Sequence, residues 1–258
     1  MEERYKKIIE AAQAGGQVLK HYFGQELEVT EKTMPSDFVT KADLEAEKTI
    51  LGILKNNFPD YNIVSEESDD ILNGSEYTFI IDPMDGTNNF FLGLANFSCT
   101  IALMKNEEII FSVVYNPMTE KLYYAIKGQG AFLNNKKIKV NSETDVHRAT
   151  VSFIAKYDHD ENFRFNVIKN LGTSNTIKRY MENWSPLLDF SMLASGKIEV
   201  IISENSELHD ILAGKLIAKE AGAVIIDLDG NIEIEDKNTT FICANNKELA
   251  DKILKLIK

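Results

Sequence analysis

The stretch Ile80-Ile81-Asp82-Pro83-Met84-Asp85-Gly86-Thr87-Asn88-Asn89-Phe90 decides how this chain folds and what it can bind. The apolar residues 77–81 predict a buried strand that stops at Asp82-Pro83, because proline cannot donate to a strand ladder. Asp82 and Asp85 then follow in a turn, beside the backbone amides of Gly86 and Thr87. Hard divalent cations such as Mg²⁺ bind oxygen ligands of this kind, often together with phosphate oxygens. The alternative is an ordinary turn, since Asp-Pro and Asp-Gly are common turn pairs.

The overall composition is that of a globular protein. The 258 residues, 44% hydrophobic and 26% charged, are enough for one large domain or two closely packed halves. No apolar run approaches the roughly 20 residues that span a bilayer, and the first residues lack the apolar core of a signal peptide. We therefore expect a cytoplasmic protein without membrane contact. Cys99 and Cys243 lie in apolar runs and predict buried free thiols.

The net charge of −12 argues against a nucleic acid polymer as partner, because such binding needs a basic surface. An anionic small molecule is not excluded, since a bound divalent cation inverts the local field of a carboxylate cluster. The charge therefore favours capture of a phosphate ester through metal.

The order of the predicted elements divides the chain into two parts. Residues 1–142 predict two amphipathic helices, the second opened by a Thr40/Asp43 capping box, against an antiparallel sheet. Residues 143–258 alternate strands and helices, which predicts a smaller α/β half. One of these helices opens at Ser185-Pro186, the preferred residues for the N-cap and the first helical position.

The quoted stretch resembles the signature of the inositol monophosphatase family, Asp-Pro-(aliphatic)-Asp-Gly-Thr-x-Asn-(aromatic), at every fixed position. Similar motifs elsewhere are Asp37-Phe38-Val39-Thr40-Lys41-Ala42-Asp43, the pair Glu66-Glu67, and His209-Asp210-Ile211-Leu212-Ala213-Gly214, in which His209 replaces the usual tryptophan. The resemblance implies an α+β or α/β fold, a layered αβαβα sandwich of the sugar-phosphatase type. Its N-terminal half, 1–142, would carry most metal ligands, and its C-terminal half, 143–258, the substrate contacts and the last metal-binding aspartate.

The resemblance also implies two or three Mg²⁺ ions and a role for each site residue. The metal ligands would be Glu66, Asp82, Asp85, Asp210 and the Met84 carbonyl. The catalytic residues would be Glu66, Asp85 and Thr87, with Thr87 and Glu66 orienting the attacking water. Asp43 and Lys32 would support the site from behind, although Asp43 also suits a capping residue and Lys32 a solvated charge. The substrate would contact Asp85, Gly86, Thr87, Ser185, Glu204 and Asp210.

The resemblance implies hydrolysis of a small phosphate monoester, without a phosphoenzyme, by a homodimer. Inositol-hydrolysing members have Gly-Ser/Thr-Ala-Ala where this chain has Trp184-Ser185-Pro186-Leu187, and Pro186 has no N–H to offer. Fructose-1,6-bisphosphate, histidinol phosphate and 3′-phosphoadenosine 5′-phosphate are therefore alternative substrates. Trp184 would stack on a ring or, in the interpretation we favour from sequence, fill core space. Lys178 and Arg179 would meet a second phosphate or form a solvated pair. The competing class is a catalytically degenerate, cation-binding regulatory protein.

Overall fold

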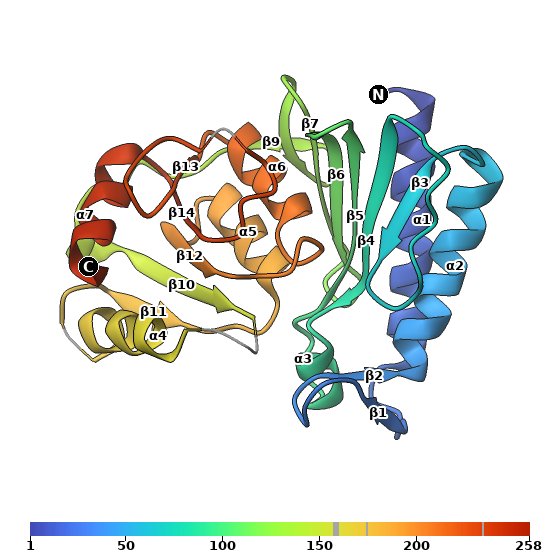
Figure 1. The fold of residues 1–258 in the computed structure, drawn as a ribbon, viewed down its shortest axis with the longest axis horizontal. Helices are drawn as coiled ribbons and strands as arrows, with labels where there is room; N and C mark the ends of the chain where they lie inside the picture. Colours follow the sequence, from blue (N-terminus) through green and yellow to red (C-terminus); the bar gives the residue numbers. More distant parts are fainter. Residues whose placement is uncertain (157–159, 174, 234) are drawn as a thin grey trace.

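The computed structural model describes residues 1–156, 160–173, 175–233 and 235–258. It stacks five layers in the order helices, sheet, helices, sheet, helices (Figure 1). This arrangement confirms the predicted αβαβα sandwich. No helix in the described part of the chain is long and apolar enough to cross a bilayer.

The first layer consists of α1 (Glu3–Tyr22) and α2 (Lys41–Asn57), which cover the outer face of the larger sheet (Figure 1). Both helices bury an apolar stripe in one core with that sheet. The predicted capping box is confirmed: Thr40 Oγ1 accepts from Ala42 N at 3.1 Å, and Asp43 Oδ2 accepts from Thr40 N at 2.8 Å. This box fixes Asp43 at the start of α2, facing the signature stretch.

The larger sheet has seven strands whose spatial order is their order in the chain. All neighbours are antiparallel except the first pair, which is parallel. The strands are β3 (Asn62–Ser65), β4 (Tyr77–Asp85), β5 (Ser98–Lys105), β6 (Glu108–Asn116), β7 (Lys121–Ile126), β8 (Gly130–Leu133) and β9 (Lys136–Ile138).

The prediction that the strand stops at Asp82-Pro83 is wrong, because β4 continues to Asp85. Its pairing with β5 shifts register between Asp82 and Asp85, which is where the proline lies. On its other side β4 pairs with β3 only as far as Ile81. Pro83 therefore lies beyond that ladder, at a bulged edge where the missing N–H is tolerated.

The smaller sheet has the order β11-β10-β12-β14-β13, with β10 parallel to both its neighbours and β14 antiparallel to both of its own. The strands are β10 (Thr150–Ala155), β11 (Arg179–Met181), β12 (Val200–Glu204), β13 (Val224–Ile226) and β14 (Phe241–Ala244). The outer layer on this side contains α4 (Glu161–Val167) and α7 (Lys247–Ile257), with a 3₁₀ turn at Val146–Arg148 and a π turn at Ile168–Gly172.

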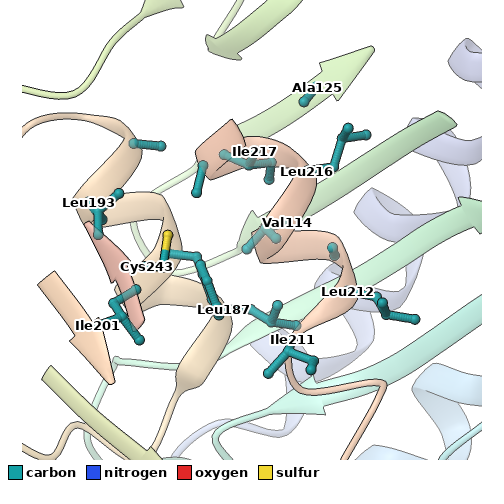
Figure 2. Close-up of a cluster of buried hydrophobic side chains, with 14 of the residues drawn as sticks. Val114, Ala125, Leu187, Leu193, Ile201, Ile211, Leu212, Leu216, Ile217 and Cys243 are labelled. Carbon is teal, nitrogen blue, oxygen red and sulfur yellow. The ribbon is translucent and has the colours of Figure 1, made fainter. Parts of the chain in front are cut away.

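The middle layer consists of α5 (Pro186–Ala194) and α6 (Leu212–Glu220), which lie between the two sheets (Figure 1). Gly214 lets them approach, because a Cβ there would meet the Phe190 ring at 2.3 Å. Figure 2 shows their shared core; it labels Val114, Ala125, Leu187, Leu193, Ile201, Ile211, Leu212, Leu216, Ile217 and Cys243. Since this core joins both sheets, the halves pack as one body; their division at 142/143 stays a prediction.

Three short elements lie at the lower end of the N-terminal half in Figure 1: β1 (Val29–Glu31), β2 (Phe38–Thr40) and α3 (Thr87–Phe91). The strands β1 and β2 form an antiparallel hairpin. The two cysteines are buried and free, as predicted.

Candidate active site

A cavity of about 600 Å³ opens between the two halves of the chain. Four predicted ligand carboxylates line it: Glu66, Asp82, Asp85 and Asp210. Met84, Gly86, Thr87 and Lys32 line the same cavity. The fold thus brings together residues that are up to 178 positions apart in the sequence, Lys32 and Asp210.

The parallel pairing of β3 with β4 places two of these carboxylates at one sheet edge. Ser65 pairs with Ile81, so the next residues, Glu66 and Asp82, leave neighbouring strand ends together. Glu66 N donates to Ile81 O at 3.2 Å, so the backbone hydrogen bonding between the two segments continues one residue beyond β3. Asp82 is buried, and its Oδ1 accepts from Met84 N at 2.9 Å, which holds the carboxylate against the bulge.

Asp85 is buried and held by groups from both halves. Its Oδ2 accepts from Ser98 Oγ at 2.8 Å and from Ser185 Oγ at 2.6 Å. Leu187 N donates to Oδ1 at 3.4 Å. Ser185 occupies the N-cap position of α5, as predicted, but its side chain makes no capping bond because it is committed to Asp85. Ser185 is fully buried and is not among the cavity-lining residues.

The three aspartates Asp82, Asp85 and Asp210 hold their protons more tightly than free aspartates do, because their pKa values are raised. Burial, followed by the charges of Glu66, Asp85 and Asp210, raises the pKa of Asp82 well above its ordinary value. Burial raises the pKa of Asp85 to about 7 and that of Asp210 to about 6. Desolvated like charges are costly, and a cation among them relieves that cost.

The donor set consists of carboxylate oxygens, which suit a hard divalent cation. Among the ion pairs of the described residues, none joins Asp82 or Asp85 to a lysine, an arginine or a histidine. No group of three or more His, Cys, Asp or Glu side chains in that part of the chain is yet arranged so that it could hold a metal. Glu66 is instead paired with Lys32, whose Nζ lies 3.0 Å from Glu66 Oε1. The residues therefore fit a cation by chemistry and charge, while Glu66 is shared with a lysine.

Lys32 bridges the acidic pair that follows β3. Its Nζ also contacts Glu67 Oε1 at 2.7 Å. Burial opposes the charge on Lys32, but Glu66 and Glu67 outweigh it and raise the lysine's pKa. Burial, and then the charge of Glu66, raises the pKa of Glu67 to about 8. Lys32 thus ties the β1–β2 hairpin to the end of β3.

Thr87 is oriented by hydrogen bonds to Asp43 and to the Met84 carbonyl. Its Oγ1 lies 3.2 Å from Asp43 Oδ1 and 3.1 Å from Met84 O, so the hydroxyl proton is directed to these acceptors. Burial raises the pKa of Asp43 to about 6. The preceding Gly86 has φ +100°, and a Cβ there would lie 3.0 Å from Asn96 O, so only glycine fits. A water in the cavity could therefore donate to the Thr87 oxygen.

Other predicted residues lie elsewhere. Glu204 is buried at the end of β12, accepts from Asp160 N at 3.4 Å, and does not line the cavity. Lys178 and Arg179 do not line it either. His209 does, with Nε2 3.9 Å from Asp210 Oδ1. The prediction that Trp184 fills core space is wrong: this side chain lines the cavity and is 57% exposed.

Sequence reasoning missed Asp189, a buried carboxylate that also lines the cavity. Its oxygens accept from Ser152 Oγ at 2.6 Å and from Asn183 Nδ2 at 2.7 Å. Burial raises its pKa to about 7. The available signal was a lone aspartate within the apolar helix Leu187-Leu188-Asp189-Phe190, since unpaired buried carboxylates are rare.

Comparison with known proteins agrees with this geometry. The family model of the inositol monophosphatase family matches residues 1–258. A protein of Aquifex aeolicus named fructose-1,6-bisphosphatase/inositol-1-monophosphatase is 35% identical over 263 residues, covering 99% of this chain and 97% of the relative. The Nus factor SuhB of Pasteurella multocida is 32% identical over 224 residues, covering 85% of this chain and 83% of the relative.

A solved structure shows the same fold along the whole chain. The crystal structure of the extragenic suppressor protein suhB from Bartonella henselae superposes with a TM-score of 0.92 at 27% identity, covering 100% of this chain and 99% of that one. This chain therefore belongs to the inositol monophosphatase family, as the full-length family match, the similar sequences and the shared fold all show.

Proposed function

We propose that this chain hydrolyses a small phosphate monoester with Mg²⁺ and a water nucleophile, without a covalent phosphoenzyme. That it is a phosphatase follows from its family and relatives. The observation that carries the finer proposal is the convergence of Glu66, Asp82, Asp85 and Asp210 on one cavity, with raised pKa values for all three aspartates. Such a concentration of desolvated negative charge is expected where cations bind.

The residues that would hold two or three Mg²⁺ ions are the four carboxylates and the carbonyl of Met84. When bound, Mg²⁺ supplies charge stabilisation of the phosphoryl group and acidifies a coordinated water. The protein's own part is to fix the carboxylates. Ser98 and Ser185 hold Asp85, and the backbone of Met84 holds Asp82.

Thr87 and Glu66 would orient the attacking water. Because Asp43 and the Met84 carbonyl accept the Thr87 proton, the threonine oxygen is available to accept from that water. Lys32 would hold Glu66 in place. Gly86 and Thr87 would offer backbone amides to the phosphate, with Asp85 and Asp210 beside them. We do not extend substrate contact to Ser185 or Glu204, since neither lines the cavity.

The substrate class proposed here is a sugar or cyclitol phosphate. The Aquifex relative is named for both fructose-1,6-bisphosphate and inositol-1-phosphate hydrolysis, and this chain covers almost all of it. The resemblance also supports a homodimer in the cytoplasm. Light scattering of the purified protein would test the dimer.

The test is release of phosphate from p-nitrophenyl phosphate with and without Mg²⁺. We expect turnover only with Mg²⁺. Asp85→Asn removes a charge at a buried position and is expected to lose at least about a hundredfold in kcat, with weaker Mg²⁺ binding. Asp60→Asn is the matched control, because Asp60 is exposed and does not line the cavity. Wild-type kinetics in Asp85→Asn would refute the assignment of Asp85.

The second candidate is a cation-binding regulatory protein, because two similar proteins are named SuhB and one of them a Nus factor. This class predicts Mg²⁺ binding without turnover. Calorimetry that shows Mg²⁺ binding, together with no phosphate release from a panel of monoesters, would establish it over the phosphatase.

A further inference from the structure

Trp184 has a backbone conformation that tryptophan rarely adopts. Its φ is +50°, in the left-handed region that favours glycine. Holding a bulky residue there costs about 1–3 kcal/mol. Its side chain is 57% exposed and lines the cavity, so core packing does not repay this cost. A strained residue at a cavity is a candidate for a functional role.

The neighbouring backbone is clamped on both sides. The buried Asn89 amide donates to Asn183 O at 2.8 Å and to Trp184 O at 3.3 Å. Asn183 Nδ2 donates to Asp189 Oδ1 at 2.7 Å, and Ser185 Oγ donates to Asp85 Oδ2 at 2.6 Å. These bonds fix the residues before and after Trp184. They hold the indole at the cavity and also hold the Asp85 carboxylate in its place among the proposed metal ligands.

The same cavity contains charged pairs that suit hydroxyl groups. Arg164 and Glu182 form an ion pair at 2.8 Å, and Lys156 and Glu207 form one at 2.5 Å; all four residues line the cavity. Paired cations and carboxylates offer both donors and acceptors, without the excess positive charge that would select a second phosphate. An aromatic face with such pairs around it matches a hydroxylated ring, whose C–H face is apolar and whose edge is polar.

We propose that Trp184 determines specificity: its indole packs against the ring of the ester's organic part, so the site prefers phosphate esters of hydroxylated rings to open-chain esters. This inference rests on the proposed phosphatase function for its location. It concerns a different part of the ligand, however, from the phosphate that the carboxylates would bind through metal.

The binding test uses the fact that Trp184 is the only tryptophan of the chain. Its emission is recorded on the wild-type protein with Ca²⁺ in place of Mg²⁺, which limits hydrolysis, during titration with glucose 6-phosphate, glycerol 3-phosphate or inorganic phosphate. We expect a saturable change with glucose 6-phosphate that the other two ligands do not produce. An equal change with inorganic phosphate, or no change with any ligand, overturns the proposal.

The kinetic test replaces the indole without adding strain. Trp184→Gly is compatible with φ +50°, and Trp184→Phe keeps an aromatic face. We expect the ratio of kcat/KM for glucose 6-phosphate to that for glycerol 3-phosphate to fall at least about tenfold in Trp184→Gly and less than about threefold in Trp184→Phe. A ratio unchanged in Trp184→Gly would mean that Trp184 only shapes the loop, which overturns the proposal.

A nucleotide gives the remaining comparison. If Trp184→Gly lowers kcat/KM more for adenosine 5′-monophosphate than for glucose 6-phosphate, the indole stacks on a planar base, and the assignment to a hydroxylated ring is wrong. If the wild-type protein hydrolyses none of these esters with Mg²⁺, the proposed function fails. The fluorescence titration still decides the role of Trp184 in that case, because it measures binding alone.

Discussion

Ser185 Oγ lies 2.6 Å from Asp85 Oδ2, so a hydroxyl of the C-terminal half hydrogen-bonds a carboxylate of the signature stretch 100 residues earlier. Both groups are buried. The bond fixes the orientation of Asp85 and at the same time joins the start of α5 to the end of β4. Geometry at the proposed metal site and packing of the two halves therefore depend on one contact.

Ser185→Ala is expected to lower Mg²⁺ affinity and kcat by about tenfold or more, as the loss of an outer hydrogen bond to a metal ligand typically does. Ser191→Ala is the matched control. Ser191 is buried on the same helix, but its Oγ donates to Leu187 O at 2.8 Å and not to Asp85. Both variants lose one buried hydroxyl hydrogen bond, but the bond of Ser185 is to a carboxylate and joins the two halves, so Ser185→Ala is expected to lose more stability in thermal unfolding. Kinetics at a temperature where both variants are folded will separate them. An equal loss of kcat in the two variants would contradict this role of Ser185.

Asn89→Asp is expected to destabilise the fold by about 2–4 kcal/mol, because it places a carboxylate where an amide donates to backbone carbonyls. Asn89 Nδ2 lies 2.8 Å from both Asn96 O and Asn183 O. The adjacent Asn88→Asp is the control, since Asn88 is only partly buried and contacts Ser36 O. Urea unfolding measures both. If Asn89→Asp lowers the free energy of unfolding no more than Asn88→Asp does, the hydrogen bonds of the Asn89 amide do not stabilise the fold.

Local patterns predicted the helices, whereas the five-layer arrangement and the convergence of the four carboxylates were predicted from the resemblance. Helices such as α2 follow local rules, because Thr40 and Asp43 cap it from within four residues. The carboxylates were predicted by resemblance, which already contains the pairing of β3 with β4 that brings Glu66 beside Asp82. The local sequence does not predict the parallel register of β3 and β4.

The errors of prediction arose where a distant partner competes with a local preference. Ser185 has the residue type and position of an N-cap, yet its hydroxyl bonds Asp85. Pro83 has the residue type of a strand end, yet β4 continues because its partner on one side has already ended. Trp184 was assigned to the core in preference to stacking on a ring, and its positive φ, like its exposure, has no signature in the residue type.

Mg²⁺ affinity is expected to rise as the pH increases from about 6 to 8. The pKa values of Asp85 and Asp210 are raised to about 7 and about 6, so protons occupy these carboxylates in competition with the metal at the lower pH. Calorimetric titration of the protein with MgCl₂ at pH 6, 7 and 8 measures this, with proton release detected in buffers of different ionisation enthalpy. A dissociation constant that stays the same across this range would contradict the coupling.

Lys215→Met is expected to lower the free energy of unfolding by about 3–5 kcal/mol, the cost of breaking a buried ion pair. The Lys215 ammonium is fully buried, paired with Glu233, and bonded to Asp236 O at 2.8 Å and Asn238 O at 2.7 Å. Its loss leaves Glu233 charged in a dry site. Lys219→Met, one turn later, breaks a more exposed pair with Asp236 and is expected to cost about 1 kcal/mol or less.

Urea unfolding measures the free energy of unfolding of the two lysine variants, which can be compared directly if its dependence on urea concentration is the same in both. The double variant Lys215→Met/Glu233→Leu is expected to recover at least about 1 kcal/mol over Lys215→Met, because it removes the stranded carboxylate. A double variant as unstable as the sum of its single changes would show that the two side chains are not coupled.

Asp189→Asn is expected to gain stability relative to the wild type as the pH rises. Burial raises the pKa of Asp189 to about 7 from an ordinary value of 3.8, so the folded chain holds this proton more tightly than the unfolded chain does. The contribution of the Asp189 proton to folding is therefore complete below pH 4 and is lost as the pH rises through about 7. Asparagine has no such proton, and its amide can still bond Ser152 and Asn183.

The measurement is the free energy of unfolding in urea at pH 5, 6, 7 and 8. The difference between Asp189→Asn and the wild type is expected to grow in favour of the variant by on the order of 1–3 kcal/mol between pH 5 and pH 8. Asp229→Asn, at an exposed turn, is the control and should show a difference that does not vary over this range. A constant difference for Asp189→Asn as well would mean that Asp189 is already ionised in the folded protein at pH 5, and that Ser152 and Asn183 stabilise its charge fully.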